Sequence, residues 1–193
     1  MDTPTPDAKN KASVIRSILN PNSQSSIPQA SSSQQINAQK IPPKLMTVCF
    51  LIENNKVLLG MKKRGFGQGR WNGFGGKLHD DETIFDAAKR EILEEVGITV
   101  NALEERGYLI FKTKDRPQDI KMHIFVAIRH VGEPKESDEM RPQWFDTDKL
   151  PLNEMWSSDA HWLPQIIAGQ SAKGEFTFDE KDNVIEHKVE FYD

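Results

Sequence analysis

The sequence lacks the features that mark several large protein classes. Its 193 residues contain a single cysteine, Cys49, which excludes a disulfide framework and a zinc site built from several cysteines. No apolar run approaches the roughly 18 residues that span a bilayer, and no apolar signal stretch lies near the start. The net charge of −4 argues against a general nucleic-acid binder. These absences predict no membrane contacts and no stable nucleic-acid binding. We also expect a monomer, located in the cytoplasm and also in the nucleus.

Residues 1–44 lack aromatic residues, glycine and glutamate altogether. They hold six of the eleven prolines, eight serines, and a net charge of +3 from five basic and two acidic residues. Such a segment cannot bury enough apolar surface to offset the entropy lost on ordering. We expect residues 1–44 to be a disordered tail and residues 45–193 to be the folded domain. The basic, serine-rich composition also suggests a mitochondrial address, which Asp2 and Asp7 argue against.

The remainder predicts a domain of the α/β (α+β) class, with a mixed sheet that has helices on its faces. Asn54-Asn55 separates two β-branched runs and indicates a hairpin. The even-numbered apolar residues from Ile120 to Ile128 alternate onto one face of a strand. The expected strands are 45–53, 57–62, a short one near 71–74, 103–111, 120–128, 173–178 and 184–191. The expected helices are 83–96, ending at Gly97, and a shorter stretch near 159–168 that Pro164 interrupts.

The chemistry concentrates on the predicted helix 83–96. Helical spacing places Glu91, Glu94 and Glu95 on one arc that partly overlaps the apolar face. Like charges three or four residues apart destabilise a helix, and a hard cation would relieve that conflict by binding the carboxylates. Mg²⁺ suits such oxygen ligands. The alternative is a solvated acidic face on which Arg90 pairs with Glu94.

The residues around this helix favour the metal interpretation. Nine positions over residues 76–98 follow the spacing G-x5-E-x7-R-E-U-x-E-E-x-G-U, where U is a bulky aliphatic residue. This pattern resembles the Nudix box, the signature of the Nudix hydrolase family, which implies a Nudix fold. A Gly-rich stretch lies nearby, but no GK[ST] follows it, so a P-loop is excluded. The nine positions are Gly76, Glu82, Arg90, Glu91, Ile92, Glu94, Glu95, Gly97 and Ile98.

Other segments resemble one branch of that family, the MutT homologues that hydrolyse oxidised purine nucleoside triphosphates. The resembling segments are 57–67, 69–77, 136–142 and Met155-Trp156. The resemblance implies Mg²⁺-dependent hydrolysis of 8-oxo-dGTP and 2-hydroxy-dATP to monophosphate and pyrophosphate, which sanitises the nucleotide pool, with Mn²⁺ as a substitute ion. The alternatives are a Nudix hydrolase of another nucleoside diphosphate derivative, and a catalytically silent module that binds nucleotide or RNA.

The same resemblance implies roles for individual residues. The metal ligands would be the Gly76 carbonyl together with Glu91, Glu94, Glu95 and Glu139. Either Glu95 or Glu139 would polarise the attacking water, Lys62 would stabilise phosphate charge, and Arg90 would orient the acids. The base pocket would contain Thr47, Phe66, Asn72, Phe111, Trp156, Ser158 and Asp159.

One position departs from the pattern of the family. The resembling enzymes carry two adjacent aspartates after Met-Trp and one spacer residue, whereas here Ser158 precedes Asp159. A pair of buried carboxylates titrates as a coupled unit, and that unit is lost with serine in the first position. The resemblance therefore leaves the preferred oxidised purine open, and we expect Asp159 to read the base edge as the sole acid.

Overall fold

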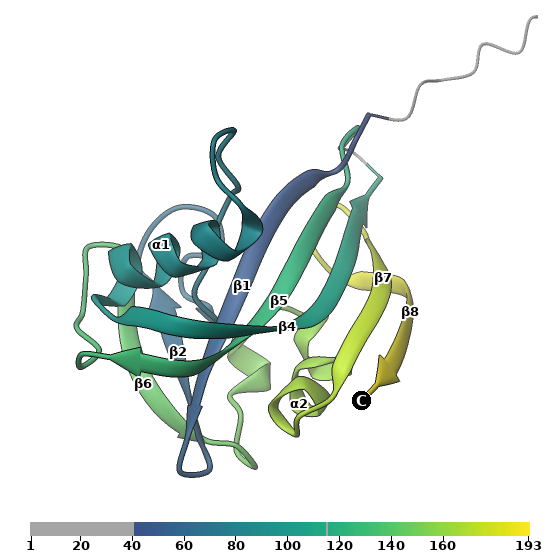
Figure 1. The fold of residues 1–193 in the computed structure, drawn as a ribbon. Coiled ribbons are helices and arrows are strands. Elements are labelled where there is room, and N and C mark those ends of the chain that lie inside the picture. The colour runs from purple at the N-terminus through teal and green to yellow at the C-terminus, as the bar shows by residue number, and fades with distance from the viewer. Residues whose placement is uncertain (1–40, 115) are drawn as a thin grey trace, which may run out of the picture. The chain divides into compact units, whose positions relative to one another are not determined.

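The computed structural model describes residues 41–114 and 116–193, so the expected tail lies almost entirely outside the described residues. One mixed sheet of eight strands has the order β3-β2-β1-β5-β4-β7-β8, and β6 pairs with β2 (Figure 1). The strands are β1 (Lys44–Glu53), β2 (Lys56–Lys62), β3 (Trp71–Asn72), β4 (Thr99–Thr113), β5 (Ile120–Val131), β6 (Met140–Asp146), β7 (Ser171–Phe178) and β8 (Val184–Tyr192). The helices are α1 (Ile84–Val96) and α2 (Leu163–Ile167), with short 3-10 turns at Leu152–Glu154 and Asp159–His161.

The two strongest local signals in the sequence produce the expected elements. Strands β1 and β2 form an antiparallel hairpin, and its turn residues Asn54 and Asn55 have φ angles of 50° and 59°. Asparagine tolerates this left-handed region, which a two-residue hairpin turn requires. Helix α1 begins after Thr83, whose side chain accepts a hydrogen bond from the Asp86 N–H, and ends at Gly97 with φ of 73°.

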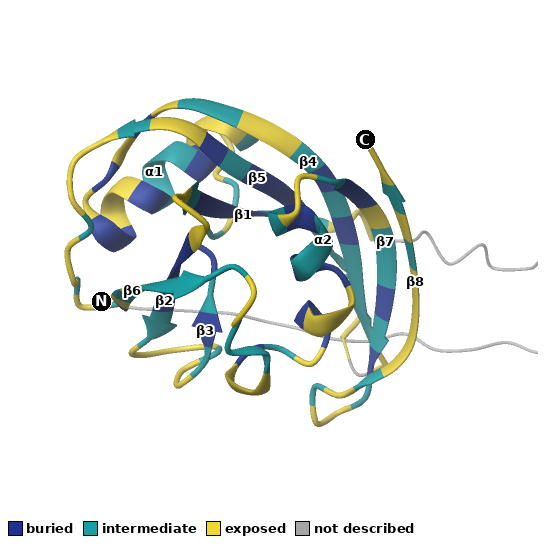
Figure 2. Ribbon diagram, turned by 90° about the horizontal axis from the view of Figure 1, so that it is seen from below, coloured by how far each residue is buried: buried dark blue, intermediate teal, exposed yellow. Residues whose placement is uncertain are grey.

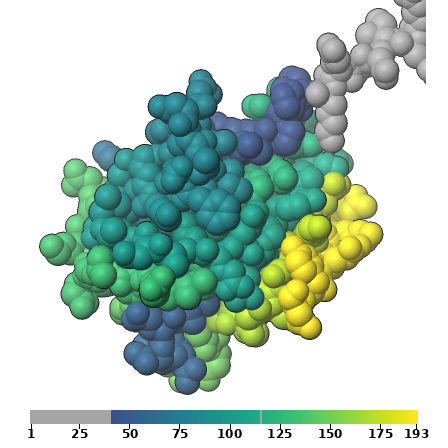
Figure 3. Space-filling view, in the orientation of Figure 1, coloured from purple at the N-terminus to yellow at the C-terminus, as the bar shows by residue number. Residues whose placement is uncertain are grey.

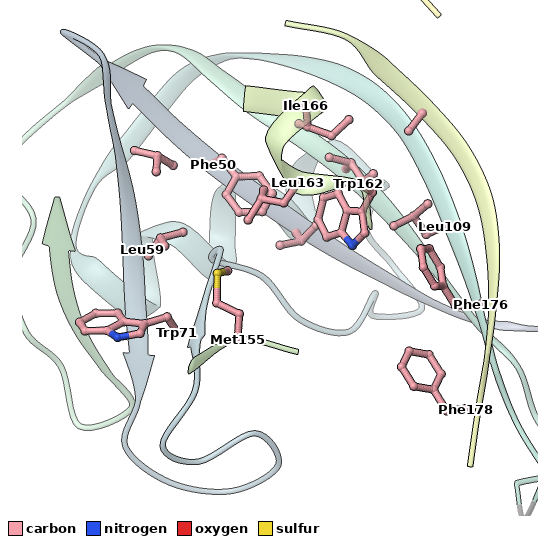
Figure 4. Packing of buried hydrophobic residues seen from close by; sticks show 14 residues of the cluster. Phe50, Leu59, Trp71, Leu109, Met155, Trp162, Leu163, Ile166, Phe176 and Phe178 are labelled. Atoms are coloured by element: carbon pink, nitrogen blue, oxygen red, sulfur yellow. The ribbon is translucent and has the colours of Figure 1, made fainter. Parts of the chain in front are cut away.

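The centre of the sheet is buried on both faces. Successive residues of β1 enter two different apolar clusters, with Val48 and Phe50 in one and Cys49 and Leu51 in the other. Helix α1 covers the second cluster, and its side chains form much of the surface seen in Figure 3. The first cluster is closed by the segment that contains α2, where Trp162 packs against Phe50 with ring centroids 6.0 Å apart (Figure 4). Figure 2 shows the buried positions along the inner strands.

Some expected elements differ from the structure. Strand β6 is not among the expected strands. It contains Pro142, which lacks the backbone donor of a regular strand residue. Strand β4 begins at Thr99, four residues earlier than expected. Ile128 is exposed although its alternation predicted burial, because β5 there extends past the cluster that covers Met122 and Ile124. Pro164 lies in the first turn of α2, where no helical N–H is lost, and so does not interrupt it.

Strand β4 depends on a glycine where its pairing with β5 shifts register. The register shifts between Glu105 and Tyr108, and Gly107 lies there with φ of +98°. On its other edge β4 runs parallel to β7, so close that a Cβ on Gly107 would lie 2.0 Å from the carbonyl oxygen of Ala172. Only glycine satisfies both the dihedral angle and the close approach.

We predict that Gly107→Ala lowers the free energy of unfolding by about 2–4 kcal/mol, because it adds a backbone clash to the strained dihedral angle. Gly97→Ala is the matched control, since its φ is also positive but no atom lies within 4 Å of the added Cβ. It should cost only about 1 kcal/mol. Urea denaturation of both variants measures the difference. Equal losses would contradict the role of the β4–β7 approach.

Candidate active site

One cavity of about 640 Å³ brings together residues that are far apart in the sequence. Acidic and basic side chains from β2, α1 and the residue before β6 lie in its wall, together with aromatic side chains from β4, β7 and the segment before α2. The predicted site residues that line it are Lys62, Phe66, Asn72, Gly76, Glu91, Glu95, Phe111, Glu139, Trp156, Ser158 and Asp159. Most of the residues singled out in the sequence therefore share one site.

The three acidic positions of α1 have very different surroundings. The side chain of Glu95 is only 4% exposed, whereas that of Glu94 is 61% exposed and lies outside the cavity wall. Glu91 lies between these extremes and lines the cavity. The helix turns Glu91 and Glu95 toward the sheet and Glu94 toward solvent, so Glu94 does not line the cavity with the other two.

The Glu95 carboxylate is held by two donors. The Gly75 N–H donates to Oε2 at 3.0 Å, and the Lys62 ammonium lies 3.4 Å from Oε1. Burial raises the pKa of Glu95 to about 7, although Lys62 and the Gly75 N–H oppose that shift. The carboxyl is thus enclosed on the apolar side of α1 and still opens onto the cavity.

Lys62 joins the helix to the distant residue Glu139. Its ammonium lies 3.0 Å from Glu139 Oε2, and Arg64 lies 3.0 Å from the other oxygen of the same carboxylate. The hydrogen bond from Lys62 holds the pKa of Glu139 below its usual value. Residues 62, 95 and 139 therefore form one charged cluster, although up to 77 positions separate them.

Arg90 ties the acidic residues of the box into a fixed arrangement. Its guanidinium contacts Glu82 through two nitrogens at 2.7 and 3.0 Å and Glu91 at 2.8 Å. It also reaches Glu94 at 3.3 Å and the Lys77 carbonyl at 3.1 Å. The Arg90–Glu94 contact of the alternative interpretation is present, but it is the longest of the guanidinium's contacts with carboxylates. Arg90 therefore chiefly positions Glu91 and the loop before the helix.

The loop before α1 fits tightly around the Glu91 carboxylate. A Cβ on Gly76 would lie 2.3 Å from Glu91 Oε1, so a larger residue here would displace the Glu91 carboxylate. The Gly76 carbonyl accepts a hydrogen bond from the Thr47 N–H at 2.8 Å and keeps a second lone pair. Carboxylate and carbonyl oxygens from Glu91, Glu95, Glu139 and Gly76 are the donor chemistry that a hard divalent cation prefers.

These donors are paired with basic groups rather than gathered around one point. Within residues 41–114 and 116–193, no three acidic, histidine or cysteine side chains have the spacing of a metal site. Glu91 faces Arg90, and Glu139 faces Lys62 and Arg64. A cation bound to these oxygens would take over part of the charge neutralisation that the arginine and lysine side chains now provide.

The other end of the cavity is aromatic and encloses one acid. Asp159 is 4% exposed, and its carboxylate accepts hydrogen bonds from the backbone N–H of Trp156 at 3.2 Å and from the Ser158 hydroxyl at 3.3 Å. Burial raises the pKa of Asp159 to about 7. Near neutral pH the protonated and ionised forms of Asp159 therefore coexist.

Thr47 is the predicted pocket residue that lies elsewhere. Alternation along β1 directs its neighbour Met46 into the cavity, whereas Thr47 is buried outside the cavity wall with its hydroxyl oxygen unpartnered. Sequence reasoning also missed several lining residues, because no motif contains them. Their only signal was apolar strand periodicity or a position in a turn. They include Met46, Arg116, Met122, Phe178 and Asp182.

Known proteins resemble this chain in both sequence and fold. The model of the NUDIX domain matches residues 43–166. The oxidized purine nucleoside triphosphate hydrolase of Danio rerio is 48% identical over 147 residues, 76% of this chain and 94% of that protein. The mouse protein of the same name (Mus musculus) is 44% identical over 146 residues, again 76% of this chain and 94% of the relative. A solved structure of the MutT protein from Bacillus halodurans has a TM-score of 0.66 at 26% identity, covering 76% of this chain and 97% of that one. The chain therefore belongs to the Nudix family.

Proposed function

We propose that this protein hydrolyses oxidised purine nucleoside triphosphates to the monophosphate and pyrophosphate. The observation that carries the proposal is the arrangement of groups in the cavity wall. The box acids and Lys62 form a charged part, and aromatic side chains with Asp159 form the other part. A nucleotide has two matching parts, because a charged phosphate chain is joined to a flat base. The relatives from Danio rerio and Mus musculus, whose names state this activity, support it.

The charged end has the groups that phosphoryl transfer requires. Glu91, Glu95, Glu139 and the Gly76 carbonyl would hold Mg²⁺, which when bound supplies charge stabilisation at the phosphate oxygens. Water attacks the β-phosphorus and breaks its bond to the oxygen that bridges to the α-phosphate, so the monophosphate leaves and pyrophosphate remains. Either Glu95 or Glu139 takes the proton of that water, and Lys62 stabilises the charge that develops on the phosphates.

The aromatic end has groups suited to a purine. Trp156 and Phe111 offer flat faces for stacking, and Asn72 carries both a donor and an acceptor. Asp159 and Ser158, both buried, would contact the Watson–Crick edge of the base. Turnover of 8-oxo-dGTP, 2-hydroxy-dATP and dGTP, measured as pyrophosphate release, and of ADP-ribose, measured as AMP formation, tests the proposal. Hydrolysis of ADP-ribose alone would favour a diphosphate substrate, and no turnover at all would favour a silent module.

We predict that Glu95→Gln lowers kcat by about 10²–10³-fold, a loss typical of removing one preorganised electrostatic contact at a phosphoryl or acyl centre. The amide keeps the shape of the side chain but removes the anion at the centre of the cluster. Glu133→Gln is the matched control, since this residue is exposed and lies outside the cavity. Steady-state kinetics with Mg²⁺ measures both variants. Near-normal turnover of Glu95→Gln would refute its role.

We predict that base preference changes with pH in the range set by Asp159. With its pKa raised to about 7, the carboxyl is mostly protonated at pH 6 and mostly ionised at pH 8. The ionised form accepts from the N1–H and N2–H donors of a guanine edge, and the protonated form can donate to N1 of an adenine edge. The ratio of kcat/KM for 8-oxo-dGTP over 2-hydroxy-dATP should rise from pH 6 to pH 8. Effects of pH on the groups that contact the phosphates are the same for both nucleotides and cancel in this ratio. A ratio that does not change with pH would therefore contradict the role of Asp159 in reading the base.

Substitutions in the same pair test the assignment without changing pH. Asp159→Asn leaves a buried base donor unmatched and should lower kcat/KM for 8-oxo-dGTP about tenfold or more. Ser158→Asp restores two adjacent acids and should increase the use of 2-hydroxy-dATP relative to 8-oxo-dGTP. The comparison uses kcat/KM for both nucleotides with each variant. If neither variant changes the ratio of kcat/KM for 8-oxo-dGTP over 2-hydroxy-dATP, recognition of the base by Asp159 and Ser158 is refuted.

A further inference from the structure

Two charged side chains at the mouth of the cavity have no role in the function proposed above. Arg116 lies in the turn between β4 and β5, and Asp182 lies in the turn between β7 and β8. Both line the cavity. Neither belongs to the Nudix box or to the segments that resemble related enzymes, so the sequence alone gave no reason to single them out.

The guanidinium of Arg116 extends an aromatic stack at the mouth. Its central carbon lies 5.5 Å from the centroid of the Phe66 ring. Phe66 in turn stacks on Trp156, with centroids 4.9 Å apart and an angle of 27° between the planes. Arg116 therefore lies at the level of the flat groups that would contact a base.

The side chains of Arg116 and Asp182 lie next to each other but form no hydrogen bond with each other. Their nearest atoms, Arg116 Nη2 and Asp182 Oδ1, are 4.0 Å apart, which is too long for a hydrogen bond. Within the two described ranges neither side chain makes any hydrogen bond. The backbone of Asp182 is nevertheless fixed, because its carbonyl accepts from the Ser157 hydroxyl at 2.9 Å. A donor and an acceptor thus lie side by side at the cavity and remain available.

The difference in exposure between the lining residues defines how a bound base would be oriented in the cavity. Asp159 at the inner end is 4% exposed, whereas Phe66 at the mouth is 65% exposed. A purine whose Watson–Crick edge meets Asp159 directs its five-membered ring toward the mouth. The edge formed by C8 and N7 then faces Arg116 and Asp182.

Oxidation at C8 changes this edge in a way that matches the pair. In guanine, N7 is an acceptor and C8 carries a hydrogen. In 8-oxoguanine the C8 oxygen is an acceptor and N7 carries a proton, so the edge offers one acceptor beside one donor. We propose that Arg116 donates to the C8 oxygen and Asp182 accepts from N7–H, which makes them specificity-determining residues for 8-oxopurines. This inference rests on the proposed function and identifies the part of the substrate that these residues recognise.

The test compares three nucleotides with variants of the pair. We expect Arg116→Leu and Asp182→Asn each to lower the ratio of kcat/KM for 8-oxo-dGTP over dGTP about tenfold, as loss of a matched polar contact does. Asparagine tolerates the positive φ of residue 182, so the turn is preserved. The kcat/KM for 2-hydroxy-dATP, which has no oxygen at C8, should change less than about twofold, well below the loss of one polar contact. Arg129→Leu and Asp148→Asn are exposed controls outside the cavity.

The outcomes separate edge recognition from general charge effects. Equal losses for all three nucleotides would show that Arg116 acts only as a cation toward the triphosphate, and would overturn the proposal. An unchanged ratio in both variants would overturn it as well. If the wild-type protein hydrolyses none of the three, the proposed function fails. Calorimetric binding of 8-oxo-dGMP and dGMP then still tests the pair, because a binding preference that both variants lose would support edge recognition without turnover.

Discussion

The burial of the Glu95 carboxylate between α1 and the sheet is the constraint on which the site depends. A carboxylate in this position is costly unless donors compensate it. The Gly75 N–H and the Lys62 ammonium provide that compensation, and each imposes a further requirement. The loop before α1 must approach the helix closely, where a Cβ on Gly76 would displace the Glu91 carboxylate, and β2 must present Lys62 to the cavity. Lys62 then brings in Glu139 from before β6.

Local signals in the sequence were enough for the elements that hold this cluster. The Asn54-Asn55 turn, the Thr83 cap and Gly97 each act through the backbone within a few residues, so the β1–β2 hairpin and α1 form where expected. The spacing of the box likewise depends on helical periodicity, which is a local property. The difference in burial between Glu94 and Glu95 could be predicted only partly from the sequence, because it depends on how the helix packs against the sheet.

Features that depend on contacts between distant segments could not be predicted. Strand β6 forms despite Pro142 because the full length of β2 is available as a partner. Thr47 lies outside the pocket because the register of β1 against β5 decides which face each residue occupies, and a shift of one residue would reverse it. Arg116 and Asp182 meet only because β4 and β7 run parallel and bring their following turns to the same end of the sheet. No pattern within either turn indicates that meeting.

The two ends of the cavity differ in how their groups are held, and this difference has a functional consequence. The acids of the phosphate end lie on α1 and before β6 and form two ion-paired groups, Glu95 and Glu139 with Lys62, and Glu91 with Arg90. A change at one position therefore alters the electrostatic environment of its ion-pair partners. The base end combines aromatic residues of β4 and β7 with the segment before α2. On that segment Asp159 is a single buried acid with a serine beside it. A lone acid titrates in one step, whereas two adjacent acids would share protons. Substitutions at the base end can therefore alter which base is bound without changing the groups that act on the phosphates.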